Sequence, residues 1–106
     1  MKTFPRSLAT FRRIVNERGQ RLRLLDFNEI ARMADAPVEQ LSVQSRPSTI
    51  GIFVERQANG NLLVVLQGFM KARYVPFVKH VALDGFYKHP DNSITPLPPE
   101  EFYRFD

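Results

Sequence analysis

The chain has 106 residues, of which 43% are hydrophobic and 11% are aromatic, with nine Phe and no Trp. A chain of this length is expected to form one domain with one core, and its apolar content argues against disorder. It contains no Cys, which excludes a disulfide framework, thiolate zinc sites and a cysteine nucleophile. Its formal net charge of +4 makes it a basic protein, so attraction to polyanions has to be considered.

The start of the chain and its apolar runs bear on localisation. No apolar segment follows Met1–Arg6, so we expect no signal peptide. The longest apolar runs have about five residues, far fewer than the ~20 that span a bilayer. The sequence therefore predicts a soluble, cytoplasmic protein without a membrane partner.

The charge is distributed unevenly along the chain. Residues 1–23 carry many cations against Glu17 alone, whereas residues 84–106 are mainly acidic. One interpretation is that the two ends neutralise each other, within the fold or across a dimer. The other is that the basic end binds a polyanion, and its candidate residues are Arg6, Arg12, Arg13, Arg18, Arg21 and Arg23.

Two helices are predicted near the N-terminus. Apolar residues recur at helical spacing over residues 5–18, and Gly19 stands where a C′ glycine would end the helix. An alternating segment at 21–24 suggests a short strand. Asp26 and Glu29 then form a capping box that predicts a second helix near 27–34.

Residues 38–44 are ambiguous between helix and strand. Leu41 and Val43 alternate as in a strand. Val38 and Leu41 have the spacing of a helix, but the next position of that apolar stripe would be the polar Ser42. We favour a strand.

The strongest local signal is a β-hairpin around Asn59-Gly60, which separates the apolar runs Ile50–Val54 and Leu62–Leu66. A two-residue type I′ turn there pairs Val54 with Val65 and Ile52 with Gln67. The second run is apolar on both faces, so it is expected to be central and covered twice. The helices cover one face, and the C-terminal segment or a second chain must close the other.

The remainder of the chain predicts further strands. Residues 73–83 suggest a strand kinked at Pro76, and residues 86–89 and 94–97 flank a turn at 90–93. Three prolines then end the sheet, and residues 100–106 are expected to form a last helical turn.

No residue pattern indicates catalysis, and we assign no catalytic, cofactor-binding or metal-ligating residue. The five glycines are isolated, and no Gly-x-Ser-x-Gly elbow is present. His80 and Asp84 resemble a base and its orienter, but in a strand they lie ~13 Å apart. The protein is therefore predicted not to be an enzyme, and the sequence names no small-molecule ligand.

Two patterns suggest nucleic-acid binding instead. Cations and aromatic residues that could hold phosphates and stack bases fall in neighbouring strands, namely Lys71, Arg73, Tyr74, Lys79, His80, Tyr87 and Lys88. Separately, residues 28–41 resemble the first helix and turn of a helix-turn-helix unit, with Ile30, Ala31, Ala34 and Leu41 at its packing positions. With the hairpin, that resemblance implies winged-helix order and DNA binding.

We expect an α+β fold in which two N-terminal helices pack on a mainly antiparallel sheet of roughly four to six strands. Residues 1–106 form one domain, with a helical part at 1–36, a sheet at 37–97 and a tail at 98–106. The predicted function is that of a non-enzymatic binding module, which self-associates as a homodimer or binds another protein through its sheet. The alternative is a nucleic-acid-binding protein.

Overall fold

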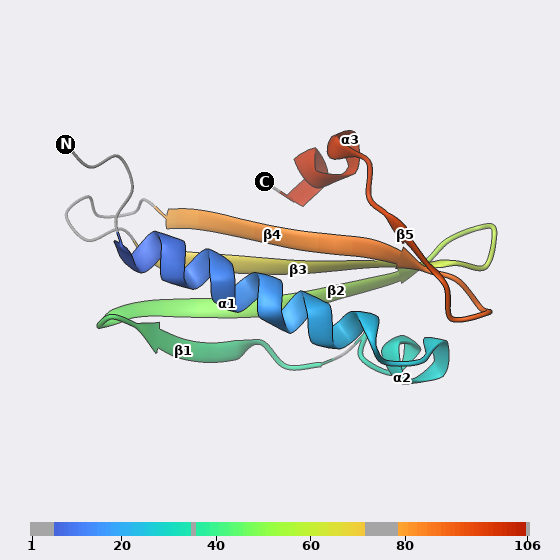
Figure 1. The fold of residues 1–106 in the computed structure, drawn as a ribbon, viewed down its shortest axis with the longest axis horizontal. Helices are drawn as coiled ribbons and strands as arrows, with labels where there is room; N and C mark the ends of the chain where they lie inside the picture. Colours follow the sequence, from blue (N-terminus) through green and yellow to red (C-terminus); the bar gives the residue numbers. More distant parts are fainter. Residues whose placement is uncertain (1–5, 35, 72–78, 106) are drawn as a thin grey trace.

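The computed structural model describes residues 6–34, 36–71 and 79–105. Within them, five antiparallel strands follow one another in the order β1-β2-β3-β4-β5, and helix α1 crosses one face of this sheet (Figure 1). The α+β class and the antiparallel sheet are confirmed. The strands are β1 (Glu39–Val43), β2 (Arg46–Arg56), β3 (Leu62–Lys71), β4 (Lys79–Lys88) and β5 (Ile94–Pro96). The helices are α1 (Arg6–Arg23), α2 (Phe27–Ala31), α3 (Pro99–Phe102) and the 3₁₀ turn η1 (Tyr103–Phe105).

Helix α1 continues through Gly19 and ends at Arg23, so the predicted helix end before the glycine and the predicted strand at 21–24 are wrong. The physical reason is that the apolar stripe continues past the glycine. Leu22 falls on the same side of the helix as Phe11 and is only 6% exposed.

Two glycines let α1 approach the sheet closely. A Cβ at Gly19 would lie 1.8 Å from Oδ2 of Asp84 on β4. A Cβ at Gly68 on β3 would lie 2.8 Å from the ring of Phe11 and 2.9 Å from Val15. Glycine is therefore used here for close packing and not to end a helix.

Helix α2 is shorter than predicted and spans Phe27–Ala31 instead of 27–34. Its capping box is confirmed, because the amide of Glu29 donates to Asp26 Oδ1 (2.8 Å) and the amide of Asp26 donates to Glu29 Oε1 (3.0 Å). Only Ile30 of this helix is buried. The N-terminal part is thus one long helix and one short helix, not two comparable packed helices.

The ambiguous segment after α2 is a strand, β1, as favoured from the sequence. Residues 39–41, the end of the segment that resembles a helix-turn-helix unit, therefore lie in a strand and not at the start of a recognition helix. A two-residue turn joins β1 to β2, with Gln44 and Ser45 at φ values of 49° and 70°. Neither residue is a usual choice for such a turn, which is why the sequence did not predict it.

The β2–β3 hairpin is confirmed, but its turn differs from the predicted one. Gly60 has a φ of 90°, whereas Asn59 is not among the described residues with positive φ. The amide of Gln57 donates to the carbonyl of Asn61 (2.8 Å), and the amide of Gly60 donates to that of Gln57 (3.0 Å). The loop therefore has three residues and places glycine at the left-handed position.

The extra loop residue shifts the register by one. Val54 lies opposite Val64, not the predicted Val65, and Ile52 lies opposite Leu66. A shift of one residue moves every side chain of β3 to the other face relative to β2. The face shared with Ile52 and Val54 consequently carries Leu62, Val64 and Leu66, and these pack in the core cluster beneath α1.

Strand β3 is central and buried on both faces, as predicted, with Leu62–Leu66 all at most 2% exposed. On the face opposite α1, Leu63 and Val65 pack with Leu97, Phe102 and Phe105. The chain's own C-terminal segment thus covers the second face at these two residues. The apolar character of β3 is therefore no longer evidence for a second chain.

Strand β4 joins two predicted strands into one, because its pairing with β3 runs without interruption from Lys79 to Lys88. The predicted kink at Pro76 lies outside the described residues. The turn at 90–93 is confirmed, with the amide of His89 bonded to the carbonyl of Ser93 (2.9 Å). Of the C-terminal aromatic residues, Phe102 and Phe105 pack on the sheet, whereas Tyr103 is 75% exposed.

Candidate strand-binding site

The edge of β4 is paired along only part of its length. Strand β5 pairs with β4 at Phe86, Tyr87 and Lys88. From Lys79 to Gly85, the side of β4 that faces away from β3 meets no other strand of the described chain.

The alternation of the backbone shows which groups this edge presents. Pro96 lies opposite Phe86 and has no N–H, so the mutually hydrogen-bonded pair between β4 and β5 is Tyr87 with Thr95. The carbonyl of Gly85 also points away from β3, because it accepts from Arg23 Nη2 (3.2 Å). Since backbone groups of a strand alternate in direction, the amides and carbonyls of residues 81 and 83 face the same open edge.

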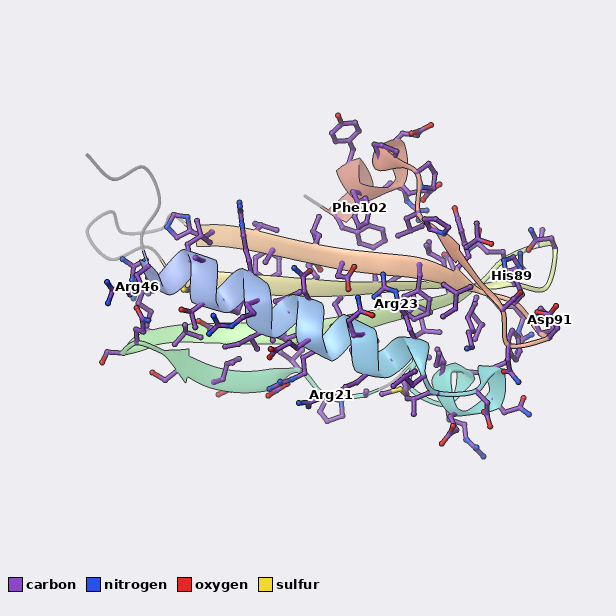
Figure 2. All side chains as sticks on the ribbon, viewed as in Figure 1. Arg21, Arg23, Arg46, His89, Asp91 and Phe102 are labelled. Atoms are coloured by element: carbon purple, nitrogen blue, oxygen red, sulfur yellow. The ribbon has the colours of Figure 1, made fainter. Side chains whose placement is uncertain are left out.

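A groove of about 300 Å³ follows this edge. Arg12 and Asn16 of α1 form one side, and Phe102 and Tyr103 form the other, with 81–83 of β4 between them. Figure 2 shows Phe102 reaching from the C-terminal helix toward the sheet. The groove therefore combines a cation, an amide and apolar surface around main-chain groups that pair with no strand of residues 6–34, 36–71 and 79–105.

A second hollow of about 410 Å³ continues from this groove along α1. It shares Arg12 and Asn16 with the groove. These residues lie seven positions before Gly19 and Arg23, which both contact β4, so they occupy the same flank of the helix. The lining of the second hollow is completed by Leu8, Ala9, Arg13, Glu17 and Gln20.

An ion pair holds α1 against β4 beside the groove. Arg23 Nη1 and Nη2 donate to the two carboxylate oxygens of Asp84, at 2.8 and 3.1 Å (Figure 2 labels Arg23). The guanidinium also lies 4.8 Å from the ring centroid of Phe86. Lys88 is only 3% exposed, and its Nζ donates to the carbonyls of Arg23 (3.3 Å) and Asn92 (2.9 Å). This network fixes the geometry of the edge.

The structure separates the six arginines proposed for polyanion binding. Arg18 donates to both carboxylate oxygens of Glu39 (3.0 and 2.6 Å), which lowers the pKa of Glu39, mainly through the hydrogen bond. Arg23 is engaged by Asp84. The remaining members of the set are exposed on α1, and they are Arg6, Arg12, Arg13 and Arg21.

The residues proposed as a basic and aromatic sheet surface do not gather on one face. Arg73 and Tyr74 lie outside the described residues. Tyr87 packs in the C-terminal cluster, where burial raises its pKa, whereas its neighbour Lys88 is buried near the end of α1. The other members stand apart along two strands, with Lys71 opposite Lys79 and Met70 opposite His80.

No protein-family model, curated protein or solved structure matches this chain. Among the described residues, no group of three or more His, Asp or Glu side chains is arranged to hold a metal ion. None of the described helices is both long and apolar enough to cross a membrane.

Sequence reasoning did not predict the open edge. The signal that could have revealed it is the mismatch between a long β4 and a neighbour that ends at Pro96, followed by Pro98 and Pro99. A strand limited by prolines can pair with only part of a longer one.

Proposed function

We propose that this protein is a protein-binding module that takes an extended segment of a partner polypeptide as an added strand beside β4. The observation that supports this most directly is that outward-facing main-chain groups of Val81 and Leu83 line a groove between α1 and the C-terminal helices. Strand addition at a sheet edge is a common mode of peptide recognition, in which main-chain hydrogen bonds give affinity and flanking pockets give specificity.

Only part of the edge is protected against strand addition. Natural sheets protect exposed edges with prolines, bulges, charged side chains or a covering helix. At Gly85 the carbonyl accepts from Arg23 of α1 and the amide donates to Asp84, so these two groups are already bonded. From Lys79 to Leu83 the sequence contains no proline, and the pairing with β3 continues without a bulge. We therefore expect a strand-shaped ligand to pair at residues 79–83.

The lining also suggests the chemistry of the ligand. Side chains of an added strand would alternate between the α1 side, where Arg12 and Asn16 lie, and the side of Leu83 and Phe102. We therefore expect a ligand in which polar side chains alternate with apolar ones.

The test uses a display library of ten-residue peptides selected against the full chain. Val81→Pro removes an outward-facing N–H, and proline is tolerated at such edge positions. The control is Gln40→Pro on β1, which also changes an outward-facing edge residue, but at the opposite side of the sheet. Folding of both variants is verified by thermal unfolding.

The proposal requires peptides that bind the wild type and Gln40→Pro but lose at least tenfold affinity for Val81→Pro. We expect a loss of about tenfold because the introduced proline removes one edge hydrogen bond and its ring blocks the approach of the peptide. The proposal is overturned if selection yields no binders, or if Val81→Pro binds them as well as the control does.

A polyanion partner would give a different result. It would use exposed arginines such as Arg6, Arg13 and Arg21, and retention on heparin would fall steeply with salt. Because Arg18 and Arg23 are paired with carboxylates and Glu17 lies within the arginine set, we expect weak retention. Strong retention that Arg12→Glu and Arg13→Glu abolish would favour the nucleic-acid alternative.

A further inference from the structure

We propose that the strand taken up at β4 is β4 of a second copy of this chain, added antiparallel across a two-fold axis at Ala82. This inference rests on the proposed function, because it names the occupant of the same open edge. Four observations support the second copy: register, side-chain chemistry, helix placement and exposed aromatic surface.

The register is self-complementary. An axis at Ala82 places Val81 of one copy opposite Leu83 of the other, and these are the residues whose amides and carbonyls face outward. Each such pair exchanges two main-chain hydrogen bonds, and the symmetry repeats the pair. A single two-fold axis thus satisfies the outward-facing groups of both residues in both copies.

The side chains are compatible with this register. At the axis, Ala82 meets its own copy in a non-hydrogen-bonded pair, where Cα atoms approach to ~4.5 Å and a small side chain is needed. Val81 and Leu83 form apolar cross-strand pairs, which stabilise antiparallel sheets. His80 falls opposite Asp84, so no like charges oppose each other at these positions.

The helices complete the match. Helix α1 contacts β4 and β3, so a two-fold axis at the edge brings two α1 helices side by side and antiparallel. Arg12 and Asn16 flank 81–83, so the helices meet near their residues 12–16. The hollow along this flank would be filled by the second helix.

The sheet face that lies away from α1 is also compatible with a second copy of the chain at this edge. Tyr103 is 75% exposed and lines the groove beside Phe102. A second copy would cover Tyr103 with its own C-terminal helix.

The first experiment is sedimentation equilibrium of the full chain over a wide concentration range. We expect the mass to rise from that of one chain, 12.3 kDa, to that of two. Val81→Pro should keep the protein monomeric, whereas Gln40→Pro should dimerise as the wild type does. A monomer at all concentrations, or a dimer that Gln40→Pro but not Val81→Pro disrupts, overturns the proposal.

A charge substitution tests the helix contact. Asn16→Arg should weaken dimerisation by about fivefold, since it adds like charges to the flank on which the two α1 helices meet beside Arg12. Glu17→Gln changes the net charge equally on the flank that faces β1, so it should leave the dimerisation constant unchanged. If Asn16→Arg dimerises as well as Glu17→Gln does, the antiparallel contact of α1 helices is wrong.

The two proposals fail in different ways. A monomeric wild type that still binds library peptides at β4 refutes the second copy and retains the strand-binding function. A monomer that binds no peptide refutes both. A dimer that Val81→Pro disrupts, and that peptides compete with, supports both.

Discussion

Arg23 and Asp84 join the end of helix α1 to the middle of strand β4, across 61 residues of sequence, with hydrogen bonds of 2.8 and 3.1 Å. Their side chains are 22% and 17% exposed. The carboxylate of Asp84 occupies the space that a side chain at Gly19 would need. The ion pair and the glycine therefore act together to set the distance between the helix and the strand edge.

Substitution of Gly19 by Ala should destabilise the protein despite the higher helix propensity of alanine. The new Cβ would lie 1.8 Å from Asp84 Oδ2, so the ion pair must move. We expect a loss of about 2–3 kcal/mol in the free energy of unfolding, measured by urea denaturation. Gly51→Ala is the matched control, since its Cβ would find its nearest atom 3.7 Å away. Equal effects of the two variants would contradict the close packing at Gly19.

The Arg18–Glu39 pair should make stability weakly dependent on pH. The pKa of Glu39 is lowered from its ordinary value of 4.5, so its stabilising effect is present above that value and disappears as pH falls through the folded-state pKa. The pair is largely exposed, so the effect is below ~1 kcal/mol. Glu39→Gln should therefore be less stable than the wild type at neutral pH and equally stable in acid.

The control for this prediction is the same substitution in an Arg18→Gln background. There the pH-dependent difference between glutamate and glutamine at position 39 should shrink, because the hydrogen-bond partner is gone and only the weaker attraction of Arg21 remains. Thermal unfolding of the four proteins supplies the comparison. A pH-dependent difference of undiminished size without Arg18 would show that Arg18 is not the main cause of the lowered pKa.

Removal of the Phe105 ring should loosen the cover of the second sheet face. Its ring centroid lies 5.0 Å from that of Phe53, and its carbonyl accepts from Gln67 Nε2 (2.6 Å). Because the ring is only partly buried, we expect Phe105→Ala to cost about 2 kcal/mol. Tyr103→Ala, at an exposed position, should leave monomer stability within ~0.5 kcal/mol. If Tyr103→Ala were as costly as Phe105→Ala, the assignment of the cover would be wrong.

Amide hydrogen exchange should alternate along β4 in the monomer. The amides of Ala82 and Asp84 face β3 and should be protected, whereas those of Val81 and Leu83 should exchange rapidly. Protection of the latter pair should rise with protein concentration if the edges of two copies pair. Uniform protection in dilute solution would show that the edge is already covered.

Much of the local structure was determined by the sequence itself. The capping box of Asp26 and Glu29, the hairpin around Gly60 and the strand at β1 depend on interactions between residues close in sequence. The double burial of β3 also followed from its composition, because an unbroken apolar run needs cover on both faces. Of the residues that line the groove beside β4, only Arg12 had been named from the sequence, because the others carry no local signal of binding.

Tertiary structure decided the rest. Position 19 needs a glycine within α1 because Asp84, distant in sequence, occupies the space beside it, and no local pattern contains that information. The hairpin register depended on one loop residue, which reverses every face of β3. The C-terminal helices, not a second chain, cover Leu63 and Val65. The open edge of β4 likewise follows from the spatial order of strands: a strand edge is open or closed according to what lies beside it.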